Sequence, residues 1–164
     1  MKIDVSEIKN IKNASLNIDI TDTINGLSDT SNDYDFYKNA NFIGKIENSD
    51  GVLKLKGRLK IAYKIKCFRC LKDVEDNLDI GIKEVFSKSN KDGYEDIYLF
   101  EEDHIEIDDA LRDNILLKLP MKKICRDDCK GLCASCGKDL NSEKCDCKRD
   151  EIDPRLEDLK KFFK

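Results

Sequence analysis

The clearest regularity in the chain is an alternation of apolar and basic residues over residues 52–66. Odd positions from Leu53 to Ile65 are aliphatic or aromatic apart from Gly57, and most even positions are Lys or Arg. Such alternation is typical of a β-strand with one buried face and one face exposed to solvent. We therefore expect one long strand here, in which Gly57 marks a bulge or a bend.

Shorter stretches of the same kind surround this strand. Further strands are predicted at residues 2–8, 14–20, 41–46 and 74–86, and a pair of strands at residues 97–107. Residues 25–35 and 87–96 are polar and contain Gly, Ser, Asn and Asp, which is typical of loops. Together these stretches predict a mostly antiparallel β domain.

Helical spacing replaces the alternation only after this β-rich part. In "IDDALRDNILLKLP", residues 107–120, Asp108 is the expected N-cap and Pro120 ends the helix. Asp153 and Pro154 predict the start of a short C-terminal helix at residues 154–163. We expect an α+β fold, with residues 1–119 forming a β-rich domain that ends in a helix. Residues 120–164 then form a cysteine-rich zinc knuckle and the C-terminal helix.

The composition favours a soluble chain with a modest core, because 39% of its 164 residues are charged and 40% are hydrophobic. No apolar run approaches the length needed to span a membrane. The N-terminal stretch "MKIDVSEIKN" lacks the layout of a signal peptide. We therefore expect a cytoplasmic protein without membrane association, in a compartment where disulfides rarely persist.

The net charge of −4 conceals a strong segregation of charge. Residues 45–72 contain nine basic and two acidic residues, a surplus of seven, whereas residues 92–110 contain nine acidic residues and no Lys or Arg. The basic face of the long strand is a candidate RNA-binding surface, formed by Lys54, Lys56, Arg58 and Lys60 and extended by Lys66 and Arg69. The alternative is a solvated face whose lysines discourage pairing with another chain.

Eight cysteines supply the other candidate chemistry. Six lie in "CRDDCKGLCASCGKDLNSEKCDC", residues 125–147, and two in "CFRC", residues 67–70. Cysteine pairs in tight turns are typical of zinc sites with four thiolate ligands. The expected site is Cys133, Cys136, Cys145 and Cys147, with Cys125 or Cys129 as the alternative to one member. A second site could consist of Cys67, Cys70, Cys125 and Cys129.

Disulfides, reduced structural thiols and a redox centre are the alternatives to metal binding. A catalytic cysteine usually needs a histidine base, and the single histidine, His104, lies among acidic residues. A catalytic metal keeps an open coordination position, whereas four cysteines close the site. We therefore expect structural zinc and no enzymatic activity.

Several of these motifs together resemble one bacterial family, the YceD-like large ribosomal RNA subunit accumulation proteins. "CFRCL" follows the long strand, and "ICRDDCKGLCASCGKDLNSEKCDC" precedes "EIDPRLEDLKKFF" near the end of the chain. Ala134 and Ser135 stand in the knuckle where a proline is frequent in the family. Some members keep C-x-R-C without most of the later cysteines, which suggests that Cys67 and Cys70 can serve without the full cluster.

The resemblance implies a non-catalytic role in the processing or accumulation of large-subunit ribosomal RNA. The expected partner is this RNA or its precursor, contacted by the basic strand face. The alternative partner is a basic ribosomal protein, docked by the acidic segment of residues 92–110.

Overall fold

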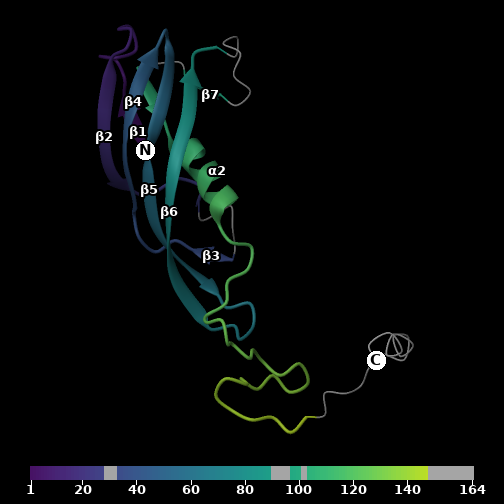
Figure 1. Ribbon diagram of the computed structural model, residues 1–164. Helices are drawn as coiled ribbons and strands as arrows, with labels where there is room; N and C mark the ends of the chain where they lie inside the picture. Colours follow the sequence, from purple (N-terminus) through teal and green to yellow (C-terminus); the bar gives the residue numbers. More distant parts are fainter. Residues whose placement is uncertain (28–32, 90–96, 101–102, 148–164) are drawn as a thin grey trace, which may run out of the picture.

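A computed structural model describes residues 1–27, 33–89, 97–100 and 103–147. Its body is a six-stranded sheet with the order β2-β4-β5-β6-β7, in which β3 pairs with the end of β5 (Figure 1). All paired strands are antiparallel except β6 and β7, which run parallel. The strands of this sheet are β2 (Ser15–Asp22), β3 (Tyr34–Asp35), β4 (Ala40–Ser49), β5 (Val52–Lys66), β6 (Asp73–Ser87) and β7 (Tyr98–Leu99).

The hairpin of β5 and β6 positions the first cysteines. Strand β5 covers the range that the alternation predicts, and its odd-numbered side chains face the core. The two strands pair without interruption until Lys66 lies opposite Asp73. In Figure 1 the hairpin extends below α2 (Asp108–Lys118), toward the green and yellow segment that contains the later cysteines.

Gly57 does not mark a bulge, so that part of the prediction is wrong. The register of β5 with both neighbours continues through this residue, which lies opposite Gly44 and Ile82. A Cβ atom at Gly57 would lie 2.5 Å from Cζ of Phe42, and one at Gly44 would lie 2.8 Å from the same atom. The two glycines therefore make room for the buried ring of Phe42.

Helix α2 and a second, two-stranded sheet cover the inner face of the large sheet (Figure 1). The small sheet pairs β1 (Lys2–Asp4) with β8 (His104–Glu106). Ala110, Leu111 and Ile115 of α2 are fully buried in one core with side chains of β4, β5 and β6. Burial of this apolar surface is the main stabilising contribution to the domain.

The start of α2 differs from the expected capping. Ile107, without a side-chain hydrogen bond, is the N-cap, and Asp108 is the first helical residue. The carboxylate of Asp108 instead accepts a hydrogen bond of 2.8 Å from Nδ2 of Asn25. The helix ends as predicted, because Leu119 is already extended in front of Pro120.

Short elements deviate most from the sequence pattern. β3 lies inside the expected loop of residues 25–35, and the expected strand pair of residues 97–107 consists of β7 and β8, which pair with β6 and β1. The predicted C-terminal helix lies outside the described residues, and the domain division after residue 119 stays a prediction. The α+β class, with a mostly antiparallel sheet, one helix and then cysteine clusters, is confirmed. Where the structure describes the chain, no helix has the length and apolar character to cross a membrane.

Candidate metal centres and basic surface

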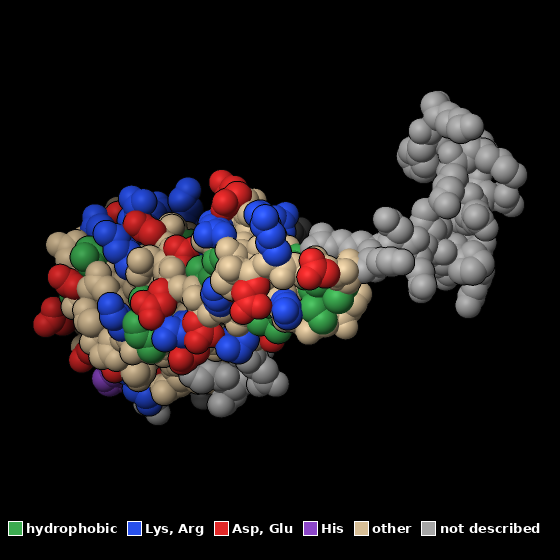
Figure 2. Space-filling view, turned by 90° about the horizontal axis from the view of Figure 1, so that it is seen from below, with side chains coloured by type: hydrophobic (Ala, Val, Ile, Leu, Met, Phe, Trp, Pro, Cys, Tyr) green, Lys and Arg blue, Asp and Glu red, His purple; other side chains and the backbone are tan. Residues whose placement is uncertain are grey.

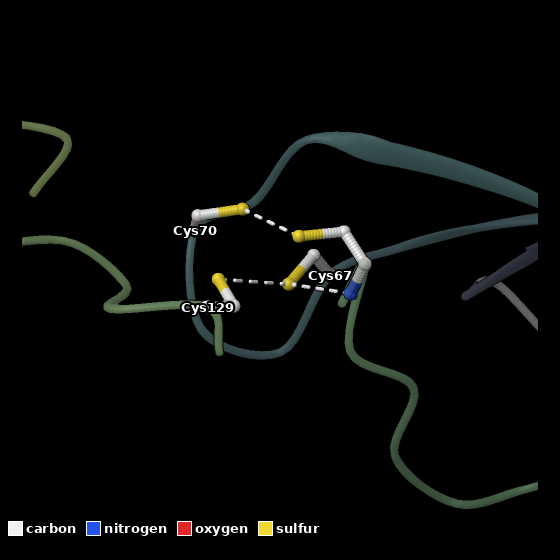
Figure 3. Close-up of side chains that lie close together, drawn as sticks. Cys67, Cys70 and Cys129 are labelled. Atoms are coloured by element: carbon white, nitrogen blue, oxygen red, sulfur yellow. Dashed lines mark hydrogen bonds between the residues drawn. The ribbon is translucent and has the colours of Figure 1, made fainter. Parts of the chain in front are cut away.

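Four cysteines from two distant segments meet at the end of the β5–β6 hairpin. Cys67 and Cys70 lie in the turn between the strands, and Cys125 and Cys129 follow α2. Their sulfur atoms all lie within 4.8 Å of one another, and Figure 3 shows the labelled Cys67, Cys70 and Cys129 directed toward a common centre. This first quartet connects the hairpin to the chain beyond the helix, within an apolar cluster that includes Val74, Ile124 and Leu132.

The sulfur positions of the first quartet suit a tetrahedral metal ion. Sγ of Cys67 lies 3.9 Å from Sγ of Cys129, and Sγ of Cys70 lies 3.6 Å from Sγ of Cys125. Zinc–sulfur bonds of about 2.3 Å in a tetrahedron place the sulfurs about 3.8 Å apart. A disulfide would require about 2.05 Å, and all eight cysteines are free.

The backbone around Cys67 favours its thiolate form. Burial raises the pKa of the Cys67 thiol, but backbone N–H groups of Cys70, Cys125 and Arg69 outweigh burial and lower the pKa to about 6. The N–H of Cys125 donates to Sγ of Cys67 over 3.3 Å. Because the thiolate is the form that binds metal, the backbone of the turn favours metal binding at Cys67.

The second quartet, Cys133, Cys136, Cys145 and Cys147, forms within one short stretch of chain. Its sulfurs also lie within 4.8 Å of one another, and Sγ of Cys145 lies 3.3 Å from that of Cys133 and 3.5 Å from that of Cys136. Backbone N–H groups of Cys136 and Ser135 lower the pKa of Cys133 to about 6. Cys136 is exposed and Cys145 and Cys147 are half-buried, whereas in the first quartet Cys125 alone is exposed and the other three are buried. The second centre therefore lies nearer the surface.

A charged contact and a backbone hydrogen bond join the two quartets. Lys72, just after the first C-x-x-C turn, forms a salt bridge of 2.7 Å with Asp139, just after the second. The hydrogen bond from Lys72 holds the pKa of Asp139 at about 2. The N–H of Leu132 donates to the carbonyl of Arg69 over 3.0 Å. The two turns therefore form one structural unit.

Each quartet has the donor set of a structural metal site. Four thiolates complete a tetrahedral coordination shell and leave no position for a substrate. The two clusters could bind metal ions such as zinc, which would cross-link the chain. The structure brings together the same two groups of four cysteines that the sequence spacing suggests. Cys125 and Cys129 belong to the first quartet rather than the second.

The predicted RNA-binding residues of β5 lie on the outer face of the sheet, but most of them have acidic neighbours. Figure 2, a view of the molecule from below Figure 1, shows Lys and Arg side chains interspersed with Asp and Glu. Surface ion pairs of this kind contribute little stability, so the lysines can exchange them for another anion. The ion pairs are Lys56 with Glu47 at 3.7 Å, Arg58 and Lys60 with Asp79 at 2.5 and 4.0 Å, and Lys66 with Asp73 at 2.9 Å.

Lys54 also has an acidic neighbour, whereas Arg69 has a different role. Lys54 lies directly opposite Glu47 in the register of β4 and β5. Arg69 is exposed, yet its guanidinium donates to the carbonyl of Cys129 over 2.9 Å. Part of the hydrogen-bonding capacity of Arg69 is therefore used to hold the first quartet together.

Three lysines on adjacent strands form a row that the sequence pattern does not reveal. Lys56 of β5 lies directly opposite Lys45 of β4 and Lys83 of β6. Like charges in directly opposite positions destabilise a sheet. Within the described residues, the acid that pairs with this row is Glu47, at 2.9 Å from Lys45 and 3.7 Å from Lys56, and Lys83 has no ion pair.

The position of Lys45 opposite Lys56 could be predicted from the sequence. Asp50 and Gly51 form the tight turn between β4 and β5, with φ values of 55° and 90°. Asp-Gly is a typical two-residue hairpin turn, and it sets Lys45 opposite Lys56. The position of Lys83 depends on the cysteine turn of residues 67–72, whose register cannot be inferred from a hydrophobic pattern. Lys83 is therefore visible only in the structure.

The acidic segment offers no such concentration of unmatched charge among its described residues. Asp103 forms an ion pair with Lys9, and Glu106 lies 2.8 Å from Lys2. Residues 92–96, 101 and 102 lie outside the described residues. Docking of a basic ribosomal protein through this segment stays a prediction.

Comparisons with known proteins agree on one family. Residues 55–163 match the family described as "Large ribosomal RNA subunit accumulation protein YceD". "Uncharacterized protein YlbN" of Bacillus subtilis is 34% identical over 103 residues, which cover 61% of this chain and 60% of that protein. No solved structure matches the chain.

Two plant proteins carry the family name. "Large ribosomal RNA subunit accumulation protein YCED homolog 1, chloroplastic" of Zea mays is 28% identical over 149 residues, 70% of this chain and 50% of that protein. The Arabidopsis thaliana protein of the same name is 45% identical over 49 residues, 30% of this chain and 15% of that protein. The chain thus covers less than two thirds of each relative's length. Since the family match spans more than half of the chain and includes both cysteine quartets, the chain belongs to the YceD family, which is named for accumulation of large-subunit ribosomal RNA.

Proposed function

We propose that the chain is a non-catalytic factor of ribosome biogenesis that acts in the cytoplasm. It contacts large-subunit ribosomal RNA or its precursor and supports the processing or accumulation of that RNA. The family description supports this class of RNA as the partner. The structural observation that carries the proposal is the row of Lys45, Lys56 and Lys83 on the outer face of the sheet.

The lysine row is best explained by an anionic partner. Neighbouring strands lie about 4.8 Å apart, so three ammonium groups share a narrow strip of surface. Lys54 lies two residues from Lys56 on the same face of β5, about 7 Å away along the strand. Phosphate groups of RNA offset the repulsion within such a cluster and release counterions when they bind.

The metal centres support this role by fixing the shape of one end of the molecule. The first quartet holds the segment after α2 against the β5–β6 turn, and the salt bridge of Lys72 and Asp139 attaches the second quartet. Zinc in both quartets would be structural. A rigid surface loses less conformational entropy when it binds RNA than a mobile one.

A pair of charge-matched variants tests the proposal. One variant replaces Lys45, Lys56 and Lys83 by Gln. The control replaces Arg58, Lys60 and Lys64 by Gln, and each of these residues lies near an acid of β6. Both remove three positive charges from the same face. We expect the first variant to lose most of its affinity for large-subunit ribosomal RNA fragments and to reduce the slope of log affinity against log salt by about 2.

The control variant should retain most of the affinity, because its three cations share two carboxylates, Asp79 and Glu75. Within the described residues, Glu47 is the one acid that pairs with the lysine row. Circular dichroism and zinc content verify that both variants fold. Unchanged affinity and unchanged salt dependence in the Lys45, Lys56 and Lys83 variant would show that the outer face does not bind this RNA.

A further inference from the structure

The two C-x-x-C turns of the chain have the same backbone design. In each turn the N–H of the first cysteine donates to the carbonyl of a lysine five residues later, Cys67 to Lys72 at 2.7 Å and Cys133 to Lys138 at 2.8 Å. The residue after the second cysteine also donates to the first cysteine's carbonyl in both turns. Because the backbone hydrogen bonds are the same, differences between the two turns lie in their side chains.

The turns differ at the residue that follows the second cysteine. Gly137 has φ of +74° in the second turn, and Leu71 has φ of +60° in the first. The left-handed region is open to glycine, but it is unfavourable for a bulky side chain. Burial of the Leu71 side chain does not offset this backbone cost, since the side chain is 58% exposed. A leucine here is unfavourable for folding, which indicates that its side chain serves another purpose.

Leu71 belongs to an apolar rim around a hollow of about 720 Å³. Phe68, from between the two cysteines of the same turn, is 61% exposed, and Met121, from the segment after α2, is 95% exposed. The backbone holds Phe68 in place, because its N–H donates to the carbonyl of Lys123 over 2.8 Å. The hollow is within the size range of sites for small ligands.

Positive charge surrounds this apolar rim. Lys66, Lys122 and Lys123 line the hollow, and Asp33 is the one acid among the described residues of its lining. Lys66 and Lys123 pair with acids of β6, whereas Nζ of Lys122 lies 4.4 Å from the centre of the Phe68 ring and has no ion pair within the described residues. A phosphate is a stronger partner for an ammonium group than an aromatic face.

An aromatic platform beside a lysine is the combination that binds unpaired nucleotides. Proteins that bind single-stranded RNA stack bases on aromatic side chains and contact the backbone with basic ones. An apolar peptide would match the rim but not the three lysines. We propose that Phe68 and Leu71 hold one unpaired base of RNA, with the adjacent phosphate bound by Lys122. This inference rests on the proposed function, because it assigns a second contact for the same RNA.

The test compares Phe68→Ala, Leu71→Gly and Lys122→Gln with Leu117→Ala, a control at a leucine that is 83% exposed on α2. Each full-length, zinc-loaded protein is titrated with an oligouridine of about 10 nucleotides and with an RNA duplex of similar length. We expect Phe68→Ala to lose about 5- to 100-fold in affinity for the single strand. Leu71→Gly should lose affinity while its melting temperature stays equal or rises, because the strained backbone is relieved. Duplex affinity and the Leu117→Ala control should not change.

Unchanged single-strand affinity in Phe68→Ala and Leu71→Gly would overturn the nucleotide site. If the Lys45, Lys56 and Lys83 variant still lost affinity in the same assay, the proposed function would stand without it. Absence of RNA binding by the unaltered protein would overturn both. A lower melting temperature in Leu71→Gly would also contradict the inference, since it would show that Leu71 serves folding.

Discussion

Cys67 and Cys129 are 62 positions apart in the chain, and their sulfur atoms lie 3.9 Å apart at the end of the β5–β6 hairpin. The residues between them include β6, β7, β8 and α2. An ion at this quartet would therefore close a long loop, and closing a long loop removes more conformational freedom from the unfolded chain than closing a short one. The second quartet spans only residues 133–147.

This difference predicts unequal consequences of losing each centre. We expect the unaltered protein to carry two zinc ions, and Cys67→Ser and Cys136→Ser to carry one each. Cys67→Ser should lower the free energy of unfolding by about 3 kcal/mol or more, because a structural zinc ion contributes substantially to folding. Cys136→Ser should destabilise mainly the local structure of residues 133–147. Native mass spectrometry measures the zinc content, and chemical denaturation measures the free energy of unfolding. Equal destabilisation by the two variants would contradict the larger contribution of the first quartet to folding.

Gly131 provides a test of how the two turns are joined. Gly131 and Gly137 both have φ of +74°, but a Cβ atom at Gly131 would lie 2.8 Å from the carbonyl oxygen of Arg69, whereas one at Gly137 would meet nothing within 4 Å. Alanine at either position should cost about 1 kcal/mol of backbone energy. Gly131→Ala should cost roughly 1–3 kcal/mol more, because the contact must move apart. Denaturation curves of zinc-loaded protein that show equal losses would disprove the close approach.

Tyr63 predicts a pH dependence at the alkaline limit. Burial raises the pKa of Tyr63 to about 12, helped by the carboxylate of Asp76, which accepts its hydroxyl hydrogen bond at 3.2 Å. Because the folded pKa exceeds the ordinary value of 10.0, the neutral phenol contributes stability fully below pH 10 and loses that contribution as the pH rises through 12.

Ultraviolet absorbance of tyrosinate measures this titration. Tyr63→Phe should remove one late-titrating group and leave Tyr98, whose pKa burial also raises. Asp76→Asn should bring the pKa of Tyr63 closer to 10, since it removes a negative charge. If Tyr63 titrates at the ordinary value of 10.0 instead, its burial beside Asp76 is incorrect.

The alternation of apolar and basic residues predicts β5 well, because a strand buried on one face must repeat every two residues. Cysteine spacing predicts two quartets, although spacing alone does not decide which quartet contains Cys125 and Cys129. The partners of β7 and β8 could not be predicted, since strands of two and three residues carry little pattern.

The lysine row shows where sequence reasoning reaches its limit. Lys54, Lys56, Arg58 and Lys60 are equivalent in the pattern of β5, but acids on neighbouring strands distinguish them in space. Asp79 contacts both Arg58 and Lys60, whereas Lys56 has lysines on both sides. Which charged side chains lie opposite one another depends on the register of the strands. The register of β6 is set by the cysteine turn rather than by β6 itself.

Crosslinking of RNA to the protein in living cells, followed by sequencing, tests the central claim most directly. The full-length protein is compared with the variant in which Lys45, Lys56 and Lys83 are Gln, at equal abundance and equal zinc content. We predict that crosslinks concentrate in large-subunit ribosomal RNA or its precursor and that the variant loses most of them. Crosslinks spread evenly over cellular RNA, or unchanged in the variant, would contradict the account.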